Sequence, residues 1–201
     1  MSSPDGIWEV RWHGRGGQGA ISSAQILAHA AYLDGFRGVT SAPSFGAERR
    51  GAPVTASTRL SREPIRILSQ IEHPQIVLVL DDTLLEAAKA TEGLVPGGWV
   101  IINSPRLPHE LELDQKFSIA TADATAIAEE VGLVVAGSVM VNTAMLGAIA
   151  RATGLVSIEN VEAALAKKFS RAQAQKNIRA ARLAFERTRV RTSDTNAHRA
   201  G

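Results

Sequence analysis

The chain has 201 residues, of which 45% are hydrophobic and 21% charged, a composition typical of a soluble protein with one α/β domain. Lys and Arg total 22 against 20 Asp and Glu, for a net charge of +2, and aromatic residues make up only 4%. Nucleic-acid binding needs a concentrated basic face with stacking aromatics, so this composition argues against it. Because the chain has no cysteine, it cannot form disulfides, ligate iron–sulfur clusters through thiolates or use a thiol nucleophile.

Targeting and metal signals are also missing from the sequence. The first residues, MSSPDGIWEV, lack the basic and long apolar regions of a secretory signal. No stretch approaches the ~20 apolar residues of a membrane span. His29 and His73 do not have metal-ligand spacing. We therefore expect a cytoplasmic protein with no membrane span and no metal site.

Alternating strand and helix patterns predict a doubly wound, mostly parallel sheet with helices on both faces and a helical C-terminal part. The expected strands are 7–12, 36–41, 54–61, 74–82, 96–104 and 116–123, with 64–68 extending or pairing with the third. The expected helices are 21–33, one through Leu84 and Ala88, 124–131, 139–153, 157–169 and 170–190. We expect a single domain over residues 1–190 and a disordered tail over 191–201.

The first expected strand runs into a glycine loop that fits G-x-G-x-x-G at Gly14, Gly16 and Gly19. Such glycines permit a tight turn and the close approach of a phosphate, and the first N–H groups of the following helix attract anions. Arg15 would add a cation beside them. A strand-to-helix turn that binds no ligand explains the same glycines equally well.

The acid that a NAD site requires is missing. That site uses an Asp or Glu about 20 residues on, at the end of the second strand, to hold the ribose hydroxyls. Here the strand ends near Ser41, and the nearest acid, Asp34, lies before it. An NADP variant would need Ser41 together with Arg49 or Arg50.

Two longer stretches are more specific than the glycine motif. The loop and its helix read GRGGQGAISSAQILAHAA, and the next segment reads APSFGAERRGAPVTASTRLS, with PI two residues later. Together they resemble the gamma subunit, or equivalent domain, of the 2-oxoacid:ferredoxin oxidoreductases, and SFGAERRGAP is most similar to the pyruvate branch. The resemblance runs from about residue 7 to residue 185 and includes GGWVIINS, GSVMVNTAMLGA and NIRAA.

This resemblance implies a function for the complex rather than for this chain alone. Such enzymes decarboxylate a 2-oxoacid on thiamine diphosphate, pass two electrons through iron–sulfur clusters to ferredoxin and deliver the acyl group to coenzyme A. The chain has no cysteine and no GDG run followed by an NN pair, so we expect thiamine diphosphate and the clusters on sibling subunits. It would be a non-redox scaffold without a complete active site, and isolated chains could pair as a homodimer. Two alternatives stay open: a free-standing NAD(P)-dependent enzyme, and a pure interaction subunit without ligand contact.

Within the family picture, this domain helps to shape the region where coenzyme A arrives, and two loops carry the candidates for that contact. Glycine N–H groups and forked guanidinium groups suit a pyrophosphate. No residue is assigned a catalytic role. The candidate binding residues are Gly14, Arg15, Gly16, Gly17, Gln18, Gly19, Ser44, Glu48, Arg49 and Arg50.

Several of these polar residues have an equally good structural explanation. Glu48 and the following arginines could form an internal ion pair with one arginine facing a partner subunit. For Gln18 we favour hydrogen bonding within the loop, and for Asn142 a structural partner. Asp82 is expected to cap the helix that follows it. The Arg-rich helix from Ser170 is expected to face solvent or a subunit.

Overall fold

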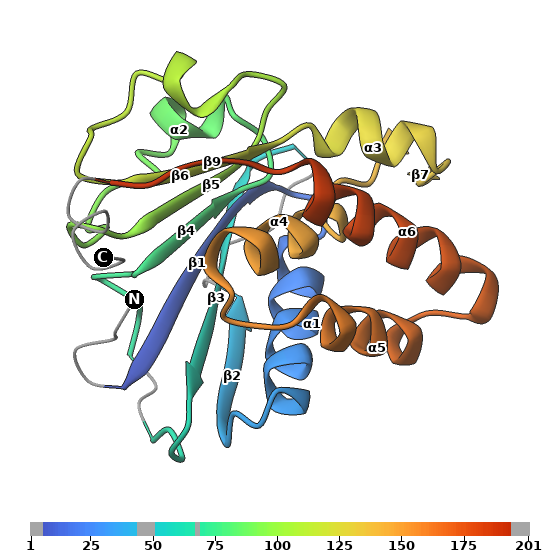
Figure 1. The fold of residues 1–201 in the computed structure, drawn as a ribbon, viewed down its shortest axis with the longest axis horizontal. Helices are drawn as coiled ribbons and strands as arrows, with labels where there is room; N and C mark the ends of the chain where they lie inside the picture. Colours follow the sequence, from blue (N-terminus) through green and yellow to red (C-terminus); the bar gives the residue numbers. More distant parts are fainter. Residues whose placement is uncertain (1–5, 44–50, 67–68, 194–201) are drawn as a thin grey trace.

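The computed structural model describes residues 6–43, 51–66 and 69–193. At its centre is a seven-stranded sheet in the order β2-β3-β1-β4-β5-β6-β9 (Figure 1). β1, β4, β5 and β6 run parallel to one another, whereas β3 and β9 run antiparallel to their neighbours, which confirms the mostly parallel sheet. The strands are β1 (Ile7–Arg15), β2 (Gly38–Pro43), β3 (Pro53–Ser61), β4 (Ile76–Val79), β5 (Trp99–Asn103), β6 (Ser118–Ala122) and β9 (Arg189–Arg191).

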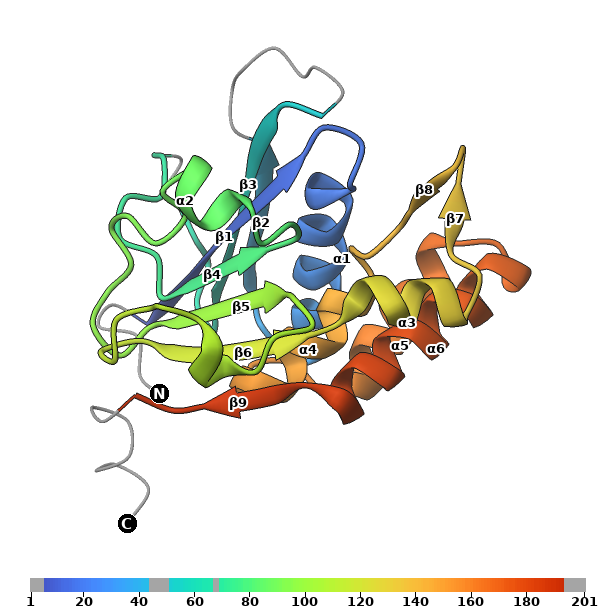
Figure 2. The same cartoon turned by 90° about the horizontal axis from the view of Figure 1, so that it is seen from above.

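Helices lie on both faces of the sheet, as predicted, but unevenly (Figures 1 and 2). Among the described residues, one face carries α1, α3, α4, α5 and α6, and the other carries only α2, a 3-10 turn (η1, Pro108–Glu110) and loops. No helix within the described ranges is long and apolar enough to cross a membrane. The helices are α1 (Ala20–Leu33), α2 (Leu84–Ala87), α3 (Ala124–Glu130), α4 (Ala144–Thr153), α5 (Ile158–Lys168) and α6 (Arg171–Arg187).

The two halves of the sheet differ in how they are covered. β4 is apolar throughout because both of its faces are buried: Leu78 packs under the main helices and Val79 under the α2 side. β1 instead alternates, with Trp12 in the main core and Arg11 and His13 on the opposite face. The sheet face opposite α1 therefore changes from apolar to polar between β4 and β1.

The C-terminal helices form one closely packed layer. α4 crosses α6 at Gly147, where an added Cβ would lie 1.8 Å from the carbonyl oxygen of Ala181. α5 follows its N-cap Ser157, whose hydroxyl accepts the Asn160 N–H at 3.3 Å. The carboxylate of Asp34, directly after α1, accepts hydrogen bonds from Ser157 and Asn160, so these contacts join the end of α1 to the start of α5.

Three parts of the C-terminal half and one earlier segment differ from the prediction. The helix expected from Val139 begins at Ala144, because residues 134–139 form a hairpin of β7 (Val134–Val135) and β8 (Ser138–Val139). The long helix expected to reach residue 190 ends at Arg187 and is followed by β9. Residues 191–193, assigned to a tail, continue the fold, and Ser193 is buried. Residues 64–66 form no strand, and 67–68 and 194–201 lie outside the described residues.

Candidate functional site

The glycine loop forms the predicted turn between β1 and α1. Gly17 and Gly19 have φ angles of 95° and 81°, which other residues rarely adopt. Gly14 lies against Leu80, whose Cδ1 would be 3.1 Å from an added Cβ. An added Cβ at Gly19 would lie 2.5 Å from Asn142 Nδ2, so the loop must be glycine here to fit against the segment before α4.

The two predicted loops meet beside the end of β1. The Gly16 N–H donates to the Ala52 carbonyl at 2.8 Å, and the Gly51 N–H donates to the Gly16 carbonyl at 3.1 Å. Gln18 Oε1 accepts the Arg15 N–H at 2.7 Å, a hydrogen bond within the loop of the kind that was favoured for it. Of the other candidates, Ser44, Glu48, Arg49 and Arg50 lie outside the described residues.

Arg15 holds the loop to the end of β4. Its Nε forms an ion pair with Asp81 at 2.8 Å, its Nη2 donates to Thr83 Oγ1 at 2.8 Å, and its Nη1 donates to the Gly51 carbonyl at 3.2 Å. Burial raises the pKa of Asp81, but the hydrogen bonds from Thr83 and Arg15 outweigh it and leave that pKa below its ordinary value. The charge of Arg15 is therefore largely neutralised by a structural partner.

The acids after β4 have a different role from the one predicted. Asp82 was expected to cap α2, but its Oδ2 accepts from Ser104 Oγ at 3.1 Å and pairs with Arg106 at 3.3 Å. Asp81 instead accepts the Thr83 N–H at 3.1 Å, directly before α2. Asp82 thus joins the carboxyl ends of β4 and β5.

The start of α1 is a helix N-terminus that directly follows the glycine loop. Its N-cap is Gly19, no described side chain caps it, and its first turn contains no acid. Helix N-terminal N–H groups that lack partners favour an anion through the partial positive charge of the helix end. Asn142 is committed elsewhere, because its Nδ2 donates to the Gly19 carbonyl at 3.3 Å, the structural partner that was predicted.

A cavity of about 690 Å³ separates this loop from the β7–β8 hairpin. One wall is the glycine loop and the other is mainly apolar, with Val135 60% exposed at the hairpin tip. The hairpin turns at Ala136 and Gly137, which both have positive φ, as a two-residue hairpin turn of this kind requires. This wall was not predicted, although the sequence VVAGSV carries a hairpin signal. The lining residues are Arg15, Gly16, Gly17, Gln18, Gly51, Val135, Ala136, Ser138, Val139 and Met140.

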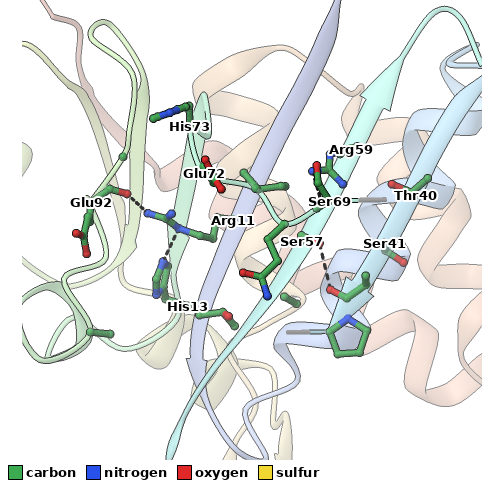
Figure 3. Close-up of a pocket in the computed structure, with 18 of the residues that line it drawn as sticks. Arg11, His13, Thr40, Ser41, Ser57, Arg59, Ser69, Glu72, His73 and Glu92 are labelled. Carbon is green, nitrogen blue, oxygen red and sulfur yellow. Dashed lines mark hydrogen bonds between the residues drawn. The ribbon is translucent and has the colours of Figure 1, made fainter. Parts of the chain in front are cut away.

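A second cavity, of about 670 Å³, lies on the polar sheet face described above (Figure 3). Arg11 Nε donates to His13 Nε2 at 3.1 Å, and Arg11 Nη2 donates to the carbonyls of Ala90 and Glu92. Burial, and then the charge of Arg11, lower the pKa of His13 to about 4, so the ring is neutral at pH 7. Here the arginine fixes a histidine and a loop, and no acid among the described residues hydrogen-bonds the histidine to orient it as a base.

Comparison with known proteins identifies the family of the chain. A family model described as pyruvate ferredoxin/flavodoxin oxidoreductase matches residues 9–187. The chain belongs to this family. A pyruvate/ketoisovalerate oxidoreductases common subunit gamma from Pyrococcus furiosus is 51% identical over 185 residues, covering 90% of this chain and 97% of the relative.

Further relatives are also named as subunits of enzymes that act on pyruvate. The pyruvate synthase subunit PorC of Methanocaldococcus jannaschii is 47% identical over 177 residues, covering 88% of this chain and 94% of the relative. The crystal structure of the pyruvate oxidoreductase subunit PORC of Thermotoga maritima has a TM-score of 0.76 at 35% identity, covering 92% and 98%. The chain is thus a gamma subunit of a 2-oxoacid:ferredoxin oxidoreductase, as the resemblance predicted, and part of a multi-subunit complex.

In this gamma subunit the glycine motif lacks the rest of a NAD site. β3 lies between β1 and β2, so the end of β2 is not adjacent to the glycine loop strand as in a dinucleotide-binding fold. β2 ends at Ser41, Ala42 and Pro43 without an acid. Asp34, the acid that precedes β2, accepts instead from the Ser157 N–H and hydroxyl at 2.8 and 2.9 Å. The free-standing NAD(P)-dependent enzyme gains no support.

Proposed function

We propose that this gamma subunit contacts coenzyme A in the cleft between the glycine loop and the β7–β8 hairpin. The observation that carries the proposal is the pairing of two unlike walls across one cavity of about 690 Å³. Coenzyme A has a charged pyrophosphate and a long, less polar pantetheine arm. The uncapped start of α1, which follows the loop, would offer N–H groups to the former, and Val135 and Val139 of the hairpin would offer apolar surface to the latter.

The contacts of individual residues change the role that each has in this proposal. Arg15 acts by holding the loop to Asp81, so its contribution to a ligand is mainly the shape of the loop. Arg49 and Arg50 remain the candidates for a direct guanidinium contact with phosphate oxygens. Val135 and Met140 join the candidates on the opposite wall.

The wider role follows from the chemistry that this chain lacks. With no cysteine it has no thiolate for an iron–sulfur cluster, so we place the clusters and thiamine diphosphate on sibling subunits and take ferredoxin as the acceptor of the complex. The Pyrococcus furiosus relative is named as a subunit common to pyruvate and ketoisovalerate oxidoreductases. A shared gamma subunit supports the idea that the other subunits select the 2-oxoacid.

Kinetics of the anaerobically purified complex test the coenzyme A contact. The assay is pyruvate- and coenzyme A-dependent reduction of a viologen dye by complexes that carry Val135→Ser. We expect the KM for coenzyme A to rise about 5-fold, because an apolar side chain buried by a ligand contributes on the order of 1 kcal/mol, while the KM for pyruvate stays unchanged.

Val134→Ser is the matched control, since Val134 is on the same hairpin and 52% exposed but does not line the cleft. It should leave both KM values unchanged. If Val135→Ser lowers the yield of assembled complex and leaves the KM for coenzyme A unchanged, the hairpin is an interaction surface only. That result would favour the pure interaction subunit.

A further inference from the structure

A separate cavity of about 370 Å³ lies at the carboxyl ends of β5 and β6. In open α/β sheets, this edge is where ligands bind. Residues from three distant parts of the chain meet here: the loop after β5, the end of β6 with the start of α3, and the junction of α6 and β9. The lining residues are Ser104, Pro105, Arg106, Leu107, Thr121, Asp123, Ala126, Ile127, Arg187 and Arg189.

Thr121 supplies a hydroxyl to the lining of this cavity. The residue is only 2% exposed and lines the cavity, yet its hydroxyl is not hydrogen-bonded to any residue that the structure describes. Ser104, equally buried in the same lining, donates to Asp82. Because its oxygen is not sealed inside the fold, the Thr121 hydroxyl is available to a group that enters the cavity.

Arg189 lies beside this hydroxyl. In the antiparallel β6–β9 ladder Arg189 is directly opposite Thr121, so both side chains project from the same face of the sheet. Arg189 forms no ion pair within the described part of the chain. Arg191, two residues on and on the same face, has a buried Nε and Nη2 without a hydrogen-bond partner. β9 thus presents positive charge that its described neighbours do not neutralise.

The other charged groups of the cavity are already paired. Arg106 pairs with Asp82 at 3.3 Å, and Arg187 pairs with Glu130 at 2.6 Å. Asp123 Oδ1 accepts the Ala126 N–H at 2.9 Å as the cap of α3. Arg106 and Arg187 are therefore neutralised parts of the walls, which leaves Arg189 and Thr121 as the residues that can bind a ligand.

We propose that this cavity binds the phosphate group of a small molecule, with Arg189 and Thr121 as the direct contacts. A forked guanidinium and a hydroxyl donor together match a tetrahedral oxyanion. The volume lies within the range of small-ligand pockets. The site is distinct from the coenzyme A cleft, because the Arg15–Asp81 and Asp82–Arg106 ion pairs lie between them along the sheet edge.

Calorimetric titration of the purified full-length chain with pyrophosphate and with inorganic phosphate, at fixed ionic strength, tests this site. We expect saturable binding that Arg189→Gln weakens about 10-fold or more and Thr121→Val weakens about 5-fold. Arg179→Gln is the matched control, because Arg179 is an exposed α6 arginine outside the cavity. It should change the affinity less than 2-fold.

Thermal melting separates a ligand contact from a structural role. Thr121→Val removes a hydroxyl that makes no described hydrogen bond, so its melting temperature should equal or exceed that of the unmodified chain. A clear decrease would mean that the hydroxyl is bonded within the fold and would overturn its assignment.

Four binding results would overturn the proposal. These are no saturable binding, an equal loss in Arg179→Gln, acetate binding as tightly as phosphate, and a loss in Arg15→Ala as large as that in Arg189→Gln. The last result would mean that the anion binds at the glycine loop. The proposal does not depend on coenzyme A binding, so either one can fail alone.

Discussion

Gly19→Ala is the sharpest perturbation of the glycine loop. The new Cβ would lie 2.5 Å from Asn142 Nδ2 and 2.9 Å from its Cγ, inside any real contact distance. Asn142 has little room to retreat, because it is 4% exposed and its backbone carbonyl accepts the Ser23 hydroxyl at 3.2 Å. The substitution also forces alanine into a φ of 81°.

The cost has two parts that can be separated. Left-handed backbone costs a non-glycine residue about 1–2 kcal/mol. Overpacking against Asn142 adds roughly 1–3 kcal/mol. The free energy of unfolding should therefore fall by about 2–5 kcal/mol, as measured by urea denaturation with tryptophan fluorescence, to which buried Trp12 contributes.

Asn142→Ala alone should cost about 1–3 kcal/mol, since it removes a buried side chain and its bond to the Gly19 carbonyl. In the double variant the overpacking disappears, so Gly19→Ala adds only its backbone strain to the cost of Asn142→Ala. The two changes should therefore couple favourably by about 1–3 kcal/mol. If their costs add within about 0.5 kcal/mol, the contact does not set the need for glycine.

Three other substitutions test separate parts of the account. The pKa of His13 is lowered from 6.5 to about 4, so the unfolded state binds the proton more tightly, and about 3 kcal/mol of stability is lost as the pH falls from 6.5 to 4. His13→Asn should therefore make the free energy of unfolding, measured by denaturation, depend less steeply on pH between 6.5 and 4. An unchanged pH dependence would contradict the burial of a neutral His13. Asp34→Ala removes three hydrogen bonds to the α5 cap and should cost about 1–3 kcal/mol by denaturation, whereas a neutral result would mean that the cap is dispensable. Gly147→Ala places a Cβ 1.8 Å from the Ala181 carbonyl and should abolish cooperative melting, and a normally melting variant would refute the tight α4–α6 crossing.

The strands and helices that the sequence predicted well are those with strong local patterns. β4 could be recognised because its residues are apolar throughout, and α1 because alanines and leucines recur at helical spacing after the glycines. β9 could not, since three residues reading RVR resemble the end of an Arg-rich helix and gain strand structure only by pairing with β6. Tertiary pairing decides such short segments.

The candidate coenzyme A cleft likewise combines features that the local sequence predicts with features that tertiary contacts decide. The glycine motif identified the loop, but it gave no sign that Arg15 pairs with Asp81, which lies at the end of another strand, 66 residues away. Nothing in the local sequence brings these two together before the parallel sheet forms. The hairpin was missed because Val139 of β8 was assigned to the start of the buried helix, which left Val134 and Val135 of β7 without a strand to pair with.

Hydrogen–deuterium exchange of the intact complex, with and without coenzyme A, tests the central claim most directly. The account predicts that coenzyme A slows exchange in two segments of the gamma subunit, residues 16–21 of the glycine loop and residues 134–140 of the hairpin. Protection in sibling subunits alone, with both gamma segments unchanged, would contradict a coenzyme A cleft in this chain.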